Sequence, residues 1–224
     1  MISKPVTADV GAPVFFLSYA RRHPRLPEPP RELNNEALQF YVELSKHVYE
    51  LLGLPAGCDA GFMDGEVDGG QKWSLELAHA IGHCQVFVPL ISPHYLTSEW
   101  CAREWHAFTR RPVRARPSAK PSPGDTPVIP VLWSYVETDR LPLAIRQVQL
   151  FTPARLPQRD IAALYRAEGL YGLLNLGEVG KQAYEAVVWR LAQRIALAFG
   201  THDVEPGEID DFENLRSWFG EGEA

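Results

Sequence analysis

Several features that define common protein classes are scarce in this chain or missing from it. Only three of its 224 residues are cysteine, and none form a CxxC pair, so the sequence predicts free thiols in a reducing cytoplasm rather than a disulfide framework. Its apolar runs are far shorter than the roughly 20 residues that a membrane-spanning helix needs. Residues 1–14 also lack the pattern of an export signal. We therefore expect a cytoplasmic protein that does not use a membrane as a partner.

Charge is unevenly distributed along the sequence. The net charge is −6, and the residues after His202 hold eight acidic side chains against one arginine. The rest of the chain is nearly neutral, so it lacks the basic footprint of a nucleic-acid-binding protein. A local basic run at residues 110–120 is interrupted and followed by prolines, which predicts a surface loop. Residues 201–224 are predicted to be an acidic, solvated tail.

Short apolar runs alternate with amphipathic stretches through most of the chain. The predicted strands are residues 14–19, 61–63, 85–91, 128–133 and 148–151, and the predicted helices begin near residues 34, 73, 98 and 178. Strands that alternate with helices predict an α/β fold with a parallel sheet covered on both faces. We expect a flavodoxin-like, five-stranded sheet of order 2-1-3-4-5 within residues 13–200, preceded by an extension at residues 1–12.

Ligands of such sheets bind at the carboxyl ends of the strands, near the switch in strand order. Ser18 and Tyr19 end the first predicted strand and Arg21 follows it, and together they offer a hydroxyl, an aromatic ring and a guanidinium group. These groups can stack on a base and bind a phosphate. The structural alternative is that Tyr19 packs in the core while Arg21 is solvated.

The second strand leads into a glycine-rich, acidic turn at residues 64–72, flanked by Trp73. This turn lacks the residues of a nucleotide phosphate loop, and its acidic residues would repel phosphate. Its glycines also do not match a calcium loop, so no metal is expected there. A protein contact or a flap over a site suits the turn better.

The helix after Ser98 places one acidic residue inside an apolar stripe. Glu104 shares a helix face with Trp100, Cys101 and Trp105, and an unpaired buried carboxylate is costly. The carboxylate is therefore paired, exposed through a gap or functional. Its candidate ion-pair partners are Arg21, Arg22 and Arg103.

Three segments, in this order, resemble Toll/interleukin-1 receptor (TIR) domains. They are the apolar strand that ends in Ser18-Tyr19, the strand and turn that start at Gly61-Phe62-Met63-Asp64, and the signature Ser98-Glu99-Trp100-Cys101-Ala102-Arg103-Glu104. The chain is also similar to bacterial TIR-like proteins of the FxsC type, through FFLSYARR, FMD and WCAREW. The resemblance implies that residues 13–200 are a TIR domain.

The resemblance implies an NAD+ nucleosidase with Glu104 as its catalytic residue and no cofactor besides the substrate NAD+. It implies that the residues that line the substrate site are Ser18, Tyr19, Arg21, Asp64, Trp73 and Trp100. The products would be nicotinamide and either ADP-ribose or a cyclic form, in anti-phage defence or signalling. Expected partners are other TIR domains, through self-association of the turn from Asp64 to Lys72, and an upstream sensor protein. The alternative function is a non-enzymatic adaptor that only docks other TIR domains.

Overall fold

A computed structural model gives the fold of the chain. It describes residues 11–21, 35–64, 75–117, 119, 124–156, 158, 160–209 and 212–220. Within these residues no helix is both long and apolar enough to cross a membrane.

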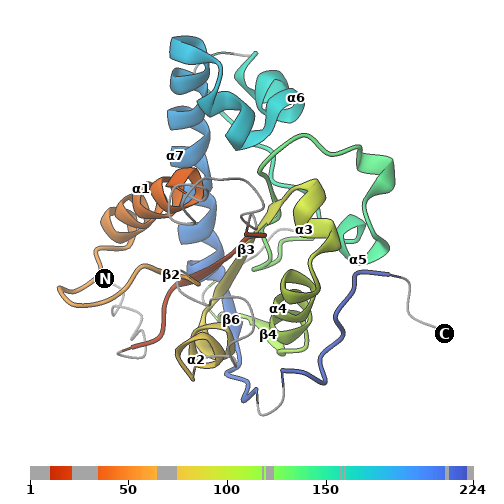
Figure 1. The fold of residues 1–224 in the computed structure, drawn as a ribbon. Coiled ribbons are helices and arrows are strands. Elements are labelled where there is room, and N and C mark those ends of the chain that lie inside the picture. Colours follow the sequence, from red (N-terminus) through yellow and green to blue (C-terminus); the bar gives the residue numbers. More distant parts are fainter. Residues whose placement is uncertain are drawn as a thin grey trace.

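A four-stranded parallel sheet forms the centre of the fold (Figure 1). Its strands are β1 (Phe15–Ser18), β2 (Gly61–Met63), β3 (Val86–Ile91) and β5 (Val131–Leu132), in the order β2-β1-β3-β5. The predicted α/β class and the positions of four predicted strands are confirmed. The predicted fifth strand at residues 148–151 is wrong, because this stretch is not a strand and Phe151 donates a single backbone hydrogen bond to Pro130 at 2.8 Å.

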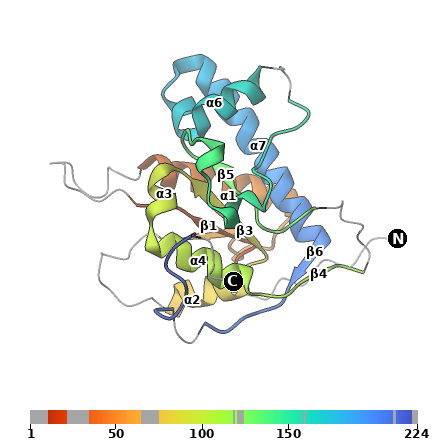
Figure 2. The ribbon, with the colours of Figure 1, turned by 90° about the vertical axis from the view of Figure 1, so that its right-hand side faces the viewer.

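Helices cover both faces of this sheet (Figures 1 and 2). They are α1 (Asn35–Leu52), α2 (Leu75–His83), α3 (Pro93–Thr97), α4 (Glu99–Thr109), α5 (Leu143–Arg146), α6 (Ile161–Leu174) and α7 (Gly177–Thr201), with a 3-10 turn at Thr138–Arg140. The buried residues of α1 and α7 share one apolar cluster, and those of α2 and α4 share another. The helices α3, α5 and α6 were not predicted.

Alternation along β1 directs neighbouring side chains to opposite faces of the sheet. Phe15 and Leu17 belong to the cluster formed with α1 and α7, whereas Phe16 belongs to the cluster formed with α2 and α4. Because side chains two residues apart in a strand share a face, Ser18 points to the same side as Phe16. The last residue of β1 therefore faces α4.

The basic run after α4 is not a simple surface loop. Its residues Val113–Ala115 form β4, which pairs antiparallel with β6 (His202–Val204). Arg111 is buried, with an exposed fraction of 5%. Its guanidinium donates to the carbonyl oxygens of Ile81, Cys84, Val204 and Glu205, at 2.7 to 3.3 Å. It therefore joins the end of α2 to the segment after α7.

The expectation of a solvated C-terminal tail is also wrong for the residues that the structure describes. Phe212, Leu215 and Phe219 are buried in the cluster formed by α2 and α4. The acidic residue Glu213, between two of these apolar residues, stays exposed. Figure 2 shows the blue C-terminal segment running beside α4.

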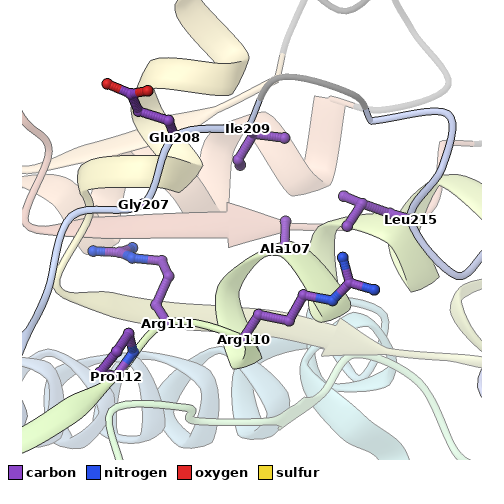
Figure 3. Close-up of a pocket in the computed structure, with 8 residues that line it drawn as sticks. All are labelled: Ala107, Arg110, Arg111, Pro112, Gly207, Glu208, Ile209 and Leu215. Atoms are coloured by element: carbon purple, nitrogen blue, oxygen red, sulfur yellow. The ribbon is translucent and has the colours of Figure 1, made fainter.

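A cavity of about 320 Å³ lies between the C-terminal end of α4 and this segment (Figure 3). Arg110 and Arg111 both line it, but their guanidinium groups point in different directions, toward Leu215 and toward Gly207. Glu104 is not among its lining residues, so this cavity is separate from the predicted catalytic residue.

Arg111→Met is expected to lower the free energy of unfolding by about 3 kcal/mol or more, because four carbonyl oxygens lose the hydrogen bonds that Arg111 donates. Urea denaturation measures the loss. The neighbouring variant Arg110→Met is the control, since Arg110 is exposed and its replacement should change stability only slightly. Equal losses in the two variants would contradict the role given to Arg111.

Candidate active site

The helix α4 places Glu104 against the end of the sheet. Ser98 caps the helix by accepting a hydrogen bond from the backbone N–H of Cys101 at 3.2 Å, and it therefore fixes where the helix begins. Glu104 follows in the second turn and is buried, with an exposed fraction of 3%. Among the residues that the structure describes, it is the only buried acid.

A hydroxyl from β1 contacts this carboxyl group directly. Ser18 donates a hydrogen bond to Oε2 of Glu104, and Oγ of Ser18 lies 3.2 Å from the hydroxyl oxygen of Tyr95. All three side chains are buried. The site is thus built from the end of β1 and from two helices, α3 and α4.

The ion-pair explanation of Glu104 is not supported within the described part of the chain. Arg21 binds the Oδ2 atom and the backbone carbonyl of Asp64, each at 2.8 Å. Arg103 pairs with Glu99 at 3.7 Å. The third candidate, Arg22, lies outside the described residues. The carboxyl group of Glu104 is therefore held by a neutral hydroxyl and not by Arg21 or Arg103.

Burial controls the charge of this group. It raises the pKa of Glu104 to about 8, with a further increase from the nearby charge of Asp64, whereas the Ser18 hydrogen bond and the charge of Arg21 act in the opposite direction. At neutral pH the carboxyl group is mostly protonated. A cation that entered the site would favour its ionised form.

Tyr19 belongs to the same group of side chains. Burial raises its pKa, and the charges of Arg21, Asp64 and Glu104 all act on its hydroxyl. The structure therefore brings together five of the seven predicted site residues: Ser18, Tyr19, Arg21, Asp64 and Glu104.

The other two predicted site residues are Trp100 and Trp73. Trp100 packs against Phe212 of the C-terminal segment, with ring centroids 4.8 Å apart, so its neighbour there is an aromatic side chain of the chain itself. Trp73 and residues 65–72 of the predicted association turn lie outside the described residues.

Sequence reasoning missed Tyr95, which is fully buried and contacts Ser18. A signal was present, because Ser92 precedes Pro93 at the end of β3. A serine cap followed by proline is typical of a helix start. The structure shows this start as α3, where Ser92 accepts a hydrogen bond from the backbone N–H of Tyr95.

Comparison with known proteins agrees with this architecture. The family model of the TIR domain matches residues 41–165, which are more than half of the chain. This chain belongs to the TIR-domain family. The search of curated proteins and the search of solved structures each gave no match.

Membership of the TIR family narrows the functions to be considered. The family includes NAD+ nucleosidases and non-enzymatic adaptors, and TIR domains mediate contacts with other TIR domains. In this TIR domain Glu104 and Asp64 lie inside the matched residues, and Ser18, Tyr19 and Arg21 lie before them.

Glu104→Gln is expected to stabilise the protein, and the gain should increase with pH. The unfolded chain releases this proton near its ordinary pKa of 4.5, but the folded chain holds it until about 8. The wild-type protein therefore loses stability as pH rises through this window, by up to several kcal/mol, whereas the neutral glutamine does not. Thermal melts at pH 4.5 to 8.5 measure the difference.

The control for these melts is Glu99→Gln, on the same helix. The side chain of Glu99 is 74% exposed, so this variant should show a small and nearly constant difference from wild type. A constant difference for Glu104→Gln as well would contradict the raised pKa of Glu104.

Proposed function

We propose that this TIR-domain protein is an NAD+ nucleosidase that cleaves the bond between nicotinamide and ribose. The observation that supports the proposal is the buried carboxyl group of Glu104, held by Ser18 at the carboxyl end of a parallel sheet. Ligands of this sheet architecture bind at that edge. No cofactor is needed, because NAD+ is the substrate.

The chemistry fits a single carboxylate. Nicotinamide in NAD+ is a cationic ring, and it takes the electron pair of the broken N–C1′ bond and leaves as a neutral molecule. No general acid is therefore required. The ribose is left with oxocarbenium character, which a nearby carboxylate stabilises. Attack of water at C1′ and loss of a proton gives ADP-ribose, and attack by a nitrogen of adenine gives a cyclic form.

The raised pKa of Glu104 suits a substrate that carries a positive charge. Burial costs the ionised carboxylate solvation, and the cationic ring of NAD+ compensates for part of this cost. The carboxylate would then bind the ribose hydroxyls as charge develops on the sugar. The electrostatic contribution is larger in a buried site than in water.

The neighbouring groups have supporting roles in this proposal. Tyr19 would pack against the nucleotide, and Arg21 would bind its phosphates. Arg21 is already paired with Asp64, so a phosphate would share or replace this carboxylate as its partner. Trp73 and Trp100 are also proposed to contact the substrate. The packing of Trp100 against Phe212 limits the part of its ring that can do so.

An adaptor is the alternative function. An adaptor needs a surface for other TIR domains, but it does not need a buried acid that pairs with no cation among the described residues, and such a group destabilises the fold. We propose that the enzyme is activated by self-association through residues 64–72, under an upstream sensor in the cytoplasm. A role in anti-phage defence or signalling is consistent with this arrangement.

Glu104→Gln is expected to lower the rate of nicotinamide release from NAD+ by at least about 100-fold, since it removes the charge that stabilises the transition state. Chromatography of nicotinamide, with protein at high concentration or with a crowding agent, gives the rate. Glu99→Gln should release nicotinamide at the wild-type rate. Equal release by wild type and Glu104→Gln would rule out the catalytic role, and no release by either would favour the adaptor.

The pH profile provides a second test of the same group. Because the ionised carboxylate is the active form, kcat/KM for NAD+ should rise with pH up to the pKa of Glu104, about 8 in the free protein. Initial rates at low NAD+ concentration, from pH 6 to pH 9, measure it. A profile that is flat across this range would contradict the assignment.

A further inference from the structure

The C-terminal segment, residues 212–220, packs on the helix that carries Glu104. Phe212, Leu215 and Phe219 are buried with exposed fractions of 6%, 8% and 3%. The segment lies beside α4 in the view of Figure 2. Although its sequence predicts a solvated tail, it forms part of the core.

Its contacts cover α4 from the first turn to the third. Phe212 lies 4.8 Å from Trp100 between ring centroids, and the guanidinium carbon of Arg103 lies 5.7 Å from the Phe212 ring. The backbone carbonyl of Trp218 lies 3.2 Å from Nε2 of His106. The segment is therefore fixed at both ends.

A further contact of the C-terminal segment, made by Phe219, reaches the candidate active site. The ring of Phe219 lies 5.5 Å from the ring of Tyr95 and 6.1 Å from that of Trp105. Both are buried rings. The ring of Tyr95 is thus held by the C-terminal segment, while its hydroxyl contacts Ser18.

When Glu104 is ionised, and so can only accept, the direction of the hydrogen bonds follows from counting protons. Ser18 has one hydroxyl proton, and it is donated to Glu104. The proton between Tyr95 and Ser18 therefore comes from Tyr95. Burial raises the pKa of Tyr95 well above its ordinary value, so this hydroxyl remains a donor. A donor at the Ser18 oxygen strengthens the bond that Ser18 makes to the carboxyl group.

We propose that the C-terminal segment positions the carboxyl group of Glu104 through Tyr95 and Ser18. Phe219 holds the ring of Tyr95, Tyr95 orients the hydroxyl of Ser18, and Ser18 fixes Oε2 of Glu104. Tyr95 and Phe219 are positioning residues, and their catalytic importance rests on the proposed function.

Other groups also act on Glu104, and the test must separate them from Tyr95. Arg21 and Asp64 contribute opposite charges from the ends of β1 and β2. Tyr19 and Cys101 interact with Glu104 as well, and burial raises the pKa of both, so they stay neutral. None of these four side chains changes when Tyr95 or Phe219 is replaced.

Tyr95→Phe and Phe219→Ala test the proposal. In both variants Ser18 is a weaker or less well oriented donor, so the pKa of Glu104 should rise, and nicotinamide release should fall about tenfold in kcat with little change in KM. Titration of the Glu104 side chain by 13C NMR measures the pKa without NAD+. The acid limb of the pH-rate profile should move to higher pH by the same amount.

Trp218→Ala is the matched control, because it removes an aromatic side chain from the same segment. This side chain is 52% exposed, and its backbone carbonyl remains available to His106. Trp218→Ala should titrate and react as wild type does. Tyr95→Phe keeps the ring and preserves the core, and Phe219→Leu replaces Phe219→Ala if the latter fails to fold.

Two results would overturn the proposal. One is a Glu104 titration in Tyr95→Phe identical to that of wild type, and the other is an equal shift in Trp218→Ala. If the wild-type protein releases no nicotinamide, the proposed function fails, but the titration still decides whether this segment positions Glu104.

Discussion

The contact between Ser18 and Glu104 is the interaction on which the site depends. A carboxyl group at this depth would ordinarily be paired with a cation, and here a serine hydroxyl from β1 occupies one of its oxygens. Burial keeps the group mostly neutral at neutral pH, whereas the Ser18 hydrogen bond favours the ionised form, which a cation would favour further. Geometry and charge are therefore linked, because the residue that positions the carboxyl group also lowers its pKa against the larger effect of burial.

The surrounding fold maintains this contact from several directions. Alternation along β1 directs Ser18 toward α4, and the Ser98 cap sets the register in which α4 presents Glu104. Arg21 and Asp64 bind each other and leave Glu104 without an arginine partner among the described residues. The site thus combines short-range signals in the sequence with contacts between segments far apart along the chain.

Much of this arrangement was predictable from the sequence because it depends on local residue patterns. The apolar runs gave the strands, and the spacing of Trp100, Glu104 and Trp105 placed an acid within an apolar helix face. The role of residues 212–220 was not predictable in this way. Its three buried apolar side chains are spaced i, i+3 and i+7, which suits one face of a helix, but residues 212–220 do not form a helix. Their burial depends instead on a surface formed by α4.

Arg111 and residues 148–151 illustrate the same limit. A buried arginine looks like its exposed neighbours in a basic run, and only the carbonyl groups brought to it by the fold distinguish it. Residues 148–151 have the composition of a strand, but a strand also needs a partner in register. Contacts between distant parts of the chain determine both the burial of Arg111 and the absence of a strand at residues 148–151.

The packing of Phe219 on Tyr95 and Trp105 also affects how the chain folds during synthesis. The ribosome makes Phe219 more than a hundred residues after α4, which at roughly 5 to 20 residues per second takes several seconds or longer. Throughout this interval the tryptophans of α4 lack their cover. The nascent chain therefore leaves this aromatic surface open until Phe219 has been made.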